Sequence, residues 1–270
     1  MTAPPEHISY LQRYVYAGSG IVLDAEKQYL MEARLAPILR ERGLASLYEL
    51  CQILRSSEHS PLHAQVVEAM TTNETYFFRE PAHYDALRKT ILPELMAMRS
   101  GTRKLTCWSA AASTGQEAYS LAMMLREIGV DGWNIDILGT DLSSRVLKQA
   151  ESGRYSQLEV NRGLPVALLL KYFRRVGLEW ELKEEVRRMA HFRSFDLRAG
   201  MQSLGPFDVV FCRNVLIYFD LPTKRRILEE IHGSLFRGGY LLVGTTEAGL
   251  PASDHFRRTT VGSAVVYAAA

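Results

Sequence analysis

Cysteine is scarce in this sequence, with 3 among 270 residues, and the three lie far apart. They form no CxxC pair and no cluster with nearby histidines, which argues against a disulfide framework and against a metal centre. We therefore interpret Cys51, Cys107 and Cys212 as reduced, buried thiols of a cytoplasmic protein.

An excess of charge of either sign is also missing, since Lys+Arg 32 stand against Asp+Glu 30. Proteins that bind nucleic acid usually show a strong basic excess, so this balance argues against a nucleic-acid partner. No apolar run reaches the ~20 residues of a membrane-spanning helix. The N-terminus, MTAPPEHISY, lacks the basic and apolar regions of a signal peptide. We expect a cytoplasmic protein without membrane insertion, and a monomer because nothing indicates an obligate assembly.

Two kinds of pattern divide the chain. Residues 1–72 show helical spacing of apolar residues only, and Pro37 should kink or break one of these helices. After Gly101, short apolar runs alternate with helical patterns. The expected strands are Lys104–Trp108, Ile135–Gly139, Phe207–Cys212, Tyr240–Val243 and Val265–Tyr267. This alternation predicts an α/β domain with a doubly wound, parallel sheet that is covered on both faces.

The segment 153–193 interrupts the alternation. It holds a helical pattern over Val166–Phe173 and then a charged stretch, Glu179–Arg188, in which short hairpin strands would fit. We interpret the segment as an insertion. The expected organisation is a helical domain over 1–72, a linker and lid over 73–100, and a sheet domain over 101–270 that carries the insertion.

Polar residues follow three of the expected strands, and ligands of doubly wound sheets bind at these carboxyl ends. The small-residue loop Ser109–Gly115 allows close approach of a ligand, and Glu117 lies in the first turn of the next helix. Asp141 follows the second strand, where a carboxylate accepts hydrogen bonds from ribose hydroxyls. Arg213 and Asn214 follow the third.

Each of these polar residues also has a simpler interpretation. Glu117 would complement a helix dipole, Asp141 would cap a helix, and Arg213 would reach solvent. Taken together, Glu117 and Asp141 favour a nucleoside ligand. The loop lacks the GxGxxG pattern, which disfavours a dinucleotide.

The segment Asn73–Glu80 (NETYFFRE) contains three consecutive aromatic residues between polar ones, which fits an amphipathic helix poorly. One interpretation is a linker that anchors one domain to another. The other is a lid whose aromatic rings pack inward while Asn73, Thr75 and Arg79 reach the ligand.

Five motifs in this order resemble the chemotaxis receptor methyltransferases, the CheR family: NETYFFRE, WSAAASTGQEAYSLAM, LGTDLSS, FDVVFCRNVLIYF and LLVGTTE. The resemblance covers nearly the whole chain. It implies a small all-α N-terminal domain and a Rossmann-like class I methyltransferase sheet with a small inserted β-subdomain. It also implies S-adenosylmethionine as cofactor and S-adenosylhomocysteine as product.

The resemblance further implies the residues of the site. The implied cofactor contacts are Asn73, Thr75, Arg79, Ala110, Glu117, Asp141, Asp196, Leu197, Arg213 and Asn214. Glu117 and Asp141 would bind the amino-acid and ribose parts. Asp196 and Leu197 would border the adenine, although the family often has Asn at the first position. Arg79, Arg213 and Tyr218 are the groups implied to meet the substrate.

The implied substrate is a glutamate side chain on the cytoplasmic helices of a methyl-accepting chemoreceptor, which becomes a methyl ester for sensory adaptation. A glutamate with a pKa of ~4.3 is ionised at neutral pH, so no general base is needed. This agrees with the absence of a histidine from the motifs. The stretch Phe173–Glu179 looks shorter than the Gly-rich loop with which some relatives bind a receptor C-terminal peptide. We therefore predict no such tether.

Three other functions stay open at this point. A methyltransferase acting on nucleic acid or a small molecule is disfavoured, because the residues after Asn214 are Val-Leu-Ile-Tyr rather than an N-P-P-Y type motif. A non-catalytic scaffold or sensor that binds the cofactor is disfavoured by the presence of Glu117 and Asp141. The same chemistry in a chemosensory pathway unrelated to motility is not distinguished by the sequence.

Overall fold

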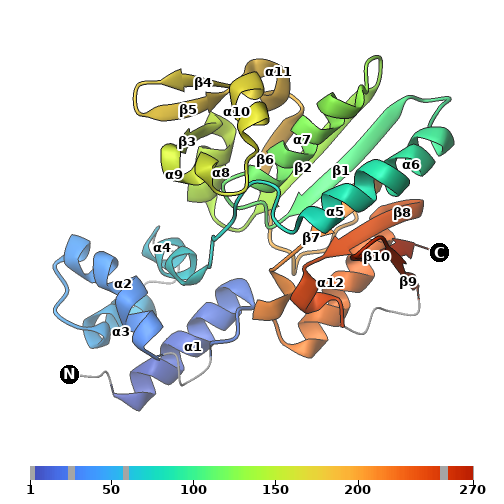
Figure 1. Ribbon diagram of the computed structural model, residues 1–270. Coiled ribbons are helices and arrows are strands. Elements are labelled where there is room, and N and C mark those ends of the chain that lie inside the picture. The colour runs from blue at the N-terminus through green and yellow to red at the C-terminus, as the bar shows by residue number, and fades with distance from the viewer. Residues whose placement is uncertain (1–3, 24–27, 57–60, 250–254, 270) are drawn as a thin grey trace. The chain divides into compact units, whose positions relative to one another are not determined.

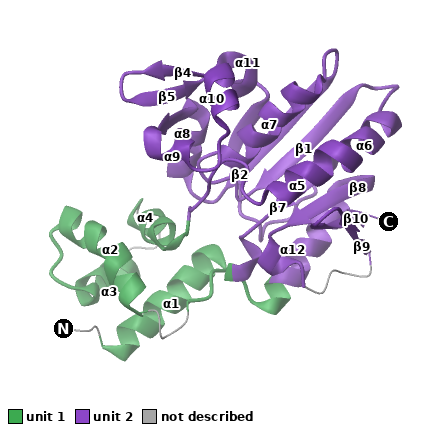
Figure 2. Cartoon of the chain, in the orientation of Figure 1, with its two compact units in different colours: residues 1–72, 218–223 green, residues 73–217, 224–270 purple. Residues whose placement is uncertain are grey.

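The computed structural model describes residues 4–23, 28–56, 61–249 and 255–269 (Figure 1). The chain divides into two compact units (Figure 2). The first comprises residues 1–72 and 218–223, and the second comprises residues 73–217 and 224–270. Each unit has its own hydrophobic core.

The first unit is helical. Its helices are α1 (Pro5–Ser19), α2 (Gln28–Arg42), α3 (Leu47–Ser56) and α4 (Pro61–Met70). Leu11 and Leu35 are examples of the apolar residues at helical spacing that are fully buried in its core. Pro37 lies inside α2, which is one helix rather than two short ones. No helix among the described residues has the length and apolar character needed to cross a membrane.

The second unit begins with a linker that runs into a long helical segment. This segment consists of α5 (Pro81–Ala86), a π-helical turn (Leu87–Ile91) and α6 (Leu92–Met98). Pro93 has no N–H to continue the α-helical pattern. In the preceding turn, the N–H of Leu92 bonds to the carbonyl of Leu87, which is the longer spacing of a π-helix.

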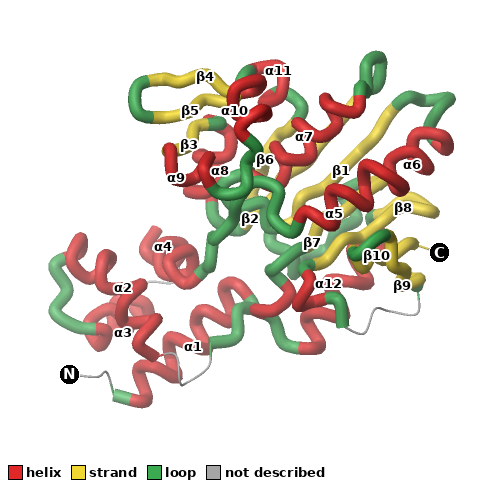
Figure 3. The backbone as a smooth tube through the Cα atoms, in the orientation of Figure 1, coloured by secondary structure: helices red, strands yellow, loops and turns green. Residues whose placement is uncertain are grey.

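The described residues of the second unit form a seven-stranded sheet with the order β6-β2-β1-β7-β8-β10-β9 (Figure 3). The strands are β1 (Lys104–Ala110), β2 (Asn134–Asp141), β6 (Ala190–Ser194), β7 (Phe207–Cys212), β8 (Leu235–Val243), β9 (Phe256–Val261) and β10 (Ala264–Ala269). Neighbouring strands among the first five, from β6 to β8, are parallel. Strand β10 pairs with β8 in the antiparallel sense, and β9 pairs with β10 in the antiparallel sense. Ala110 lies beside both Thr140 and Cys212, so the carboxyl ends of β1, β2 and β7 lie side by side.

Helices follow these strands as the alternation predicts. They are α7 (Gln116–Ile128) after β1, α8 (Ser144–Ser152) after β2 and α12 (Leu221–Gly233) after β7. All five expected strands are present, which confirms the doubly wound α/β prediction. The expectation of a wholly parallel sheet is wrong, because β10 pairs with β8 in the antiparallel sense. Strands β6 and β9 were not predicted.

A small antiparallel sheet, β3-β5-β4, follows α8. Its strands are β3 (Arg154–Ser156), β4 (Phe173–Val176) and β5 (Glu179–Leu182), and its helices are α9 (Gln157–Asn161), α10 (Val166–Tyr172) and α11 (Glu184–Arg187). The small inserted β-subdomain implied by the resemblance is thus confirmed. The segment 153–193 overlaps β6, which pairs with β2 in the main sheet.

The predicted hairpin within Glu179–Arg188 is wrong in position. The hairpin joins β4 to β5 through Gly177, whose φ of 63° supplies the left-handed turn. Residues 184–187 form α11 instead, since Glu184 and Glu185 in its first turn favour a helix N-terminus.

Candidate functional site

The loop after β1 has an unusual backbone. Ala111, Ser113 and Gly115 have φ values of 59°, 51° and 91°, in the left-handed region. Non-glycine residues keep this conformation only where their surroundings impose it. Here the backbone N–H of Ser113 donates to Asp141 Oδ2 at 2.9 Å, and a Cβ on Gly115 would lie 2.9 Å from that of Ala150. The loop is therefore held against the end of β2.

Asp141 connects the first two strand ends. Its Oδ2 accepts from Ser113 N, and its Oδ1 accepts from Ser143 N at 2.9 Å. Ser143, not Asp141, caps α8, because its side chain accepts from Val146 N. The simpler interpretation of Asp141 as that helix's cap is therefore wrong, and its buried carboxylate lies at the carboxyl end of β2.

Glu117 binds two groups at the strand ends. Its Oε1 accepts from Ser109 Oγ at 2.7 Å, and its Oε2 lies 3.1 Å from Nη1 of Arg213. Burial raises the pKa of Glu117, although Arg213 and Ser109 act in the opposite direction. The carboxylate thus faces β1 and β7 and does more than complement the dipole of α7.

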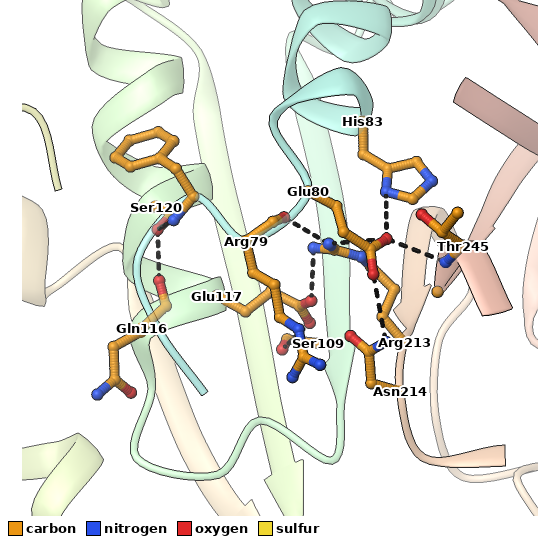
Figure 4. A network of polar contacts seen from close by, with 12 residues as sticks. Arg79, Glu80, His83, Ser109, Gln116, Glu117, Ser120, Arg213, Asn214 and Thr245 are labelled. Carbon is orange, nitrogen blue, oxygen red and sulfur yellow. Dashed lines mark hydrogen bonds and ion pairs between the residues drawn. The ribbon is translucent and has the colours of Figure 1, made fainter. Parts of the chain in front are cut away.

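Arg213 lies inside the protein, with 1% of its side chain exposed, so the interpretation that it reaches solvent is wrong. Its guanidinium lies between Glu117 and Glu80, and Nη2 is 3.3 Å from Glu80 Oε2 (Figure 4). The same nitrogen donates to the backbone carbonyl of Arg79. Among the described residues, Nε of Arg213 has no hydrogen-bond partner. Arg213 thus joins the linker to the ends of β1 and β7.

Glu80 is a site residue that sequence reasoning missed. Its Oε1 accepts from Asn214 Nδ2 at 3.2 Å, and its Oε2 accepts from Thr245 N at 3.1 Å. Oε2 also lies 3.2 Å from His83 Nδ1 and 3.3 Å from Arg213. Burial acts to raise the pKa of Glu80, but the hydrogen bond from His83 and the charge of Arg213 outweigh it and hold this pKa well below its usual range.

Glu247, in the motif LLVGTTE, was also missed. Its buried carboxylate accepts from three backbone N–H groups, those of Gly244 at 2.8 Å, Asn214 at 2.6 Å and Ile217 at 3.2 Å. Asn214 has a left-handed backbone, with φ of 58°. Glu247 therefore fixes the turn after β7, and with it the side chain of Asn214, against the end of β8.

Two of the three aromatic residues of the linker, Phe77 and Phe78, pack against neighbouring elements, as both the anchoring-linker and the lid interpretations expect. Phe77 is fully buried, with its ring centroid 5.0 Å from that of Tyr155 and 5.8 Å from that of Phe173, both in the inserted subdomain. The ring of Phe78 lies 5.1 Å from that of Tyr84 in α5. The linker is thus attached to the inserted subdomain through Phe77 and to α5 through Phe78.

The three polar residues predicted in the linker are placed differently. The carbonyl of Asn73 accepts from Ser113 Oγ at 2.7 Å, which ties the linker to the loop after β1. Thr75 is half-buried. Arg79 donates to the carbonyl of Glu74 at 3.1 Å and makes no ion pair with any described residue. In Figure 4 its side chain extends away from the contact between Glu80 and Arg213.

Asp196 and Leu197 follow β6. The backbone N–H of Phe195 donates to the carbonyl of Asp141 at 3.0 Å, so the two residues begin beside the end of β2. The Asp196 carboxylate binds the guanidinium of Arg198, with Nη2 at 2.7 Å, and Leu197 is buried. Ala110 is buried at the end of β1.

Tyr218 belongs to the first unit. Its backbone carbonyl accepts from Val22 N at 2.9 Å, and its ring packs against the core of that unit. Its role beside Arg79 and Arg213 stays a prediction.

Two family models match the chain. Residues 73–265 match "CheR methyltransferase, SAM binding domain", and residues 6–71 match "CheR methyltransferase, all-alpha domain". The chain is 42% identical over 256 residues to chemotaxis protein methyltransferase 1 of Pseudomonas aeruginosa, a match that covers 93% of each protein. It is 41% identical to chemotaxis protein methyltransferase Cher2 of Pseudomonas putida, again over 93% of each. Chemotaxis protein methyltransferase 1 of Vibrio cholerae is 35% identical over 94% of each.

Proposed function

The chain belongs to the CheR methyltransferase family, and we propose that it methylates glutamate side chains on the cytoplasmic helices of a methyl-accepting chemoreceptor. It is an S-adenosylmethionine-dependent chemotaxis methyltransferase with the class I fold, an all-α N-terminal domain and a small antiparallel sheet. The proposal adds the chemical identity of the acceptor, a carboxylate, and its location in the cytoplasm.

The residues at the strand ends fit the cofactor. The carboxylates of Glu117 and Asp141 suit the ammonium and ribose hydroxyls of S-adenosylmethionine, and the loop of Ala111–Gly115 presents only small side chains. Leu197 offers an apolar surface to the adenine beside Asp196. When bound, S-adenosylmethionine supplies a methyl group made electrophilic by its attachment to a positively charged sulfur.

The observation that carries the proposal is the contrast between Arg79 and Arg213. Arg213 is buried and paired with Glu80 and Glu117, whereas Arg79 forms no ion pair with a described residue and only contributes its charge to the lowered pKa of Glu74. A guanidinium without an ion pair is suited to hold an incoming carboxylate through paired hydrogen bonds. We therefore assign Arg79 to the orientation of the substrate glutamate.

The chemistry needs alignment rather than acid–base catalysis. A substrate carboxylate oxygen attacks the methyl carbon, a C–O bond forms, and the C–S bond breaks with its electron pair left on sulfur. No proton moves, because glutamate is already ionised at neutral pH. Arg79 contributes orientation, and too strong a grip would reduce the nucleophilicity of the oxygen. The role of Tyr218 toward the substrate stays a prediction.

Incubation with tritiated S-adenosylmethionine and a receptor cytoplasmic fragment tests the proposal. Base-labile label on the receptor, lost when its methylated glutamates are replaced by alanine, is the expected result because methyl esters hydrolyse in base. Base-stable label, or label on added nucleic acid, would contradict a carboxylate acceptor. Cofactor binding without transfer to any receptor fragment would favour a non-catalytic scaffold.

We further propose that the enzyme needs no tether to a receptor C-terminal peptide. The hairpin from β4 to β5 turns through only Gly177 and Leu178. This short turn leaves no Gly-rich loop in the hairpin to receive a peptide. Calorimetry with a receptor C-terminal pentapeptide should show no binding, and micromolar binding would overturn this point.

A further inference from the structure

The backbone around Arg79 is fixed on both sides. On one side, Phe78 has φ of 51°, and its N–H donates to Ser120 Oγ at 2.9 Å. On the other side, Glu80 has φ of 57° and ψ of 73°. Left-handed backbone at two non-glycine residues is unfavourable by itself, so other contacts must hold it. Arg79 therefore lies in a turn whose backbone conformation is held by contacts of Phe78 and Glu80.

Glu80 supplies most of those contacts. Its carboxylate joins the linker to the end of β7 through Asn214 and Arg213, and to the end of β8 through Thr245. It also contacts His83 in the first turn of α5 (Figure 4). Its lowered pKa agrees with an ionised acceptor at neutral pH.

A second contact reinforces this arrangement. Arg213, which pairs with Glu80, donates to the carbonyl of Arg79 as well. Loss of the charge on Glu80 would leave Arg213 paired with Glu117 alone, and the turn would lose its main link to β7. The guanidinium of Arg79 would then sample orientations other than the one that receives a substrate.

We propose that Glu80 is a positioning residue for methyl transfer, which holds Arg79 toward the substrate carboxylate by binding Arg213, Asn214 and Thr245. The inference rests on the proposed function, because it takes Arg79 as the residue that orients the substrate. Glu80 does not touch substrate or cofactor in this proposal, and its effect passes through Arg79.

The test is a double-mutant cycle in the full-length enzyme with Glu80→Gln, Arg79→Ala and both together. Glu80→Gln should lower kcat about 10- to 100-fold, as small misplacements of orienting groups do. Its affinity for S-adenosylhomocysteine in calorimetry should stay close to the wild-type value. If Glu80 acts through Arg79, the double variant should be no slower than Arg79→Ala.

Asp85→Asn is the matched control. It removes one carboxylate from the same helical segment, at an exposed pair with Arg88, and should keep the wild-type rate. If Glu80→Gln does not fold, Glu80→Asp keeps the charge while withdrawing the carboxylate, and the same rate loss is expected.

The outcomes separate the two proposals. If Arg79→Ala is slow but Glu80→Gln has the wild-type rate, only the role of Glu80 is overturned. If the two rate losses multiply in the double variant, Glu80 does not act through Arg79 and the inference fails. If Arg79→Ala is fully active, the proposed role of Arg79 fails, and the inference fails with it.

Discussion

Arg213 and Glu117 form an ion pair, with 3.1 Å between Nη1 and Oε2, although 96 residues separate them. The pair joins the end of β7 to the first turn of α7. Because Arg213 also contacts Glu80, one buried cation lies between a carboxylate of the linker and a carboxylate of α7. This guanidinium is therefore the group that the two carboxylates share, and both also accept hydrogen bonds from other residues.

Removal of that guanidinium should be costly. Arg213→Met leaves Glu80 and Glu117 without their cation, and breaking a buried pair in this way costs about 3–5 kcal/mol. Urea unfolding should show this loss in the free energy of unfolding. Arg88→Met, which breaks an exposed pair with Asp85, should cost at most ~1 kcal/mol. Equal losses of unfolding free energy in the two variants would mean that the buried ion pairs of Arg213 do not stabilise the fold more than an exposed pair does.

Replacement of Arg79 should affect rate without affecting stability. Among the described residues its side chain makes one hydrogen bond, to the carbonyl of Glu74, and its guanidinium lies 5.5 Å from the ring centroid of Tyr76. Arg79→Lys should therefore change the free energy of unfolding by only about 0.5 kcal/mol. Lysine keeps the charge but cannot bind a carboxylate with two parallel hydrogen bonds. Receptor methylation should therefore be slower than in the wild type and faster than in Arg79→Ala. A lysine variant as fast as the wild type would show that paired hydrogen bonds are not used.

The positions of Glu117 and Asp141 beside the strand ends could be predicted from the sequence, because Asp141 follows a short apolar run and Glu117 lies in the first turn of the helix after the small-residue loop. Glu80 and Glu247 could not. Their partners are backbone N–H groups and side chains from other strand ends, such as Thr245 for Glu80, and no local spacing reveals them. The signal that was available is their position as the last residue of the motifs NETYFFRE and LLVGTTE.

The missed strands have a similar explanation. Strand β6 has the sequence AHFRS and lies at the edge of the sheet, where most of its side chains are exposed. An edge strand buries too little to show the apolar run that identified β1 and β7. In β9, only Phe256 is buried. The sequence pattern therefore predicted the central strands and missed those at the two edges.

The lowered pKa of Glu80 leads to a prediction for how the stability of the protein depends on pH. A carboxyl whose pKa is depressed on folding contributes stability that is fully present above its ordinary value of 4.5 and is lost as the pH falls toward its folded pKa. The free energy of unfolding should therefore decrease as the pH is lowered from 4.5 to about 3. Glu80→Gln should be less stable at neutral pH and show a shallower decrease. Parallel curves for the two proteins would indicate that Glu80 has an ordinary pKa.

The attachment of the linker to the inserted subdomain can be tested at Gly163. This residue has φ of 81°, and a Cβ there would lie 2.0 Å from the carbonyl oxygen of Phe77. Gly163→Ala must therefore displace Phe77, which lies two residues before Arg79. We expect a loss of about 1–3 kcal/mol from overpacking in addition to the cost of left-handed alanine. The methylation rate should fall as well.

Gly177→Ala is the matched control for this effect. Its φ of 63° imposes the same left-handed cost of roughly 1–2 kcal/mol, but no atom lies within 4 Å of its added Cβ. The control should therefore lose some stability and keep its methylation rate. If both variants lose the same stability and both keep the wild-type rate, the contact between Gly163 and Phe77 does not position the linker. A rate loss confined to Gly163→Ala would connect the insertion, through Phe77, to the orientation of Arg79.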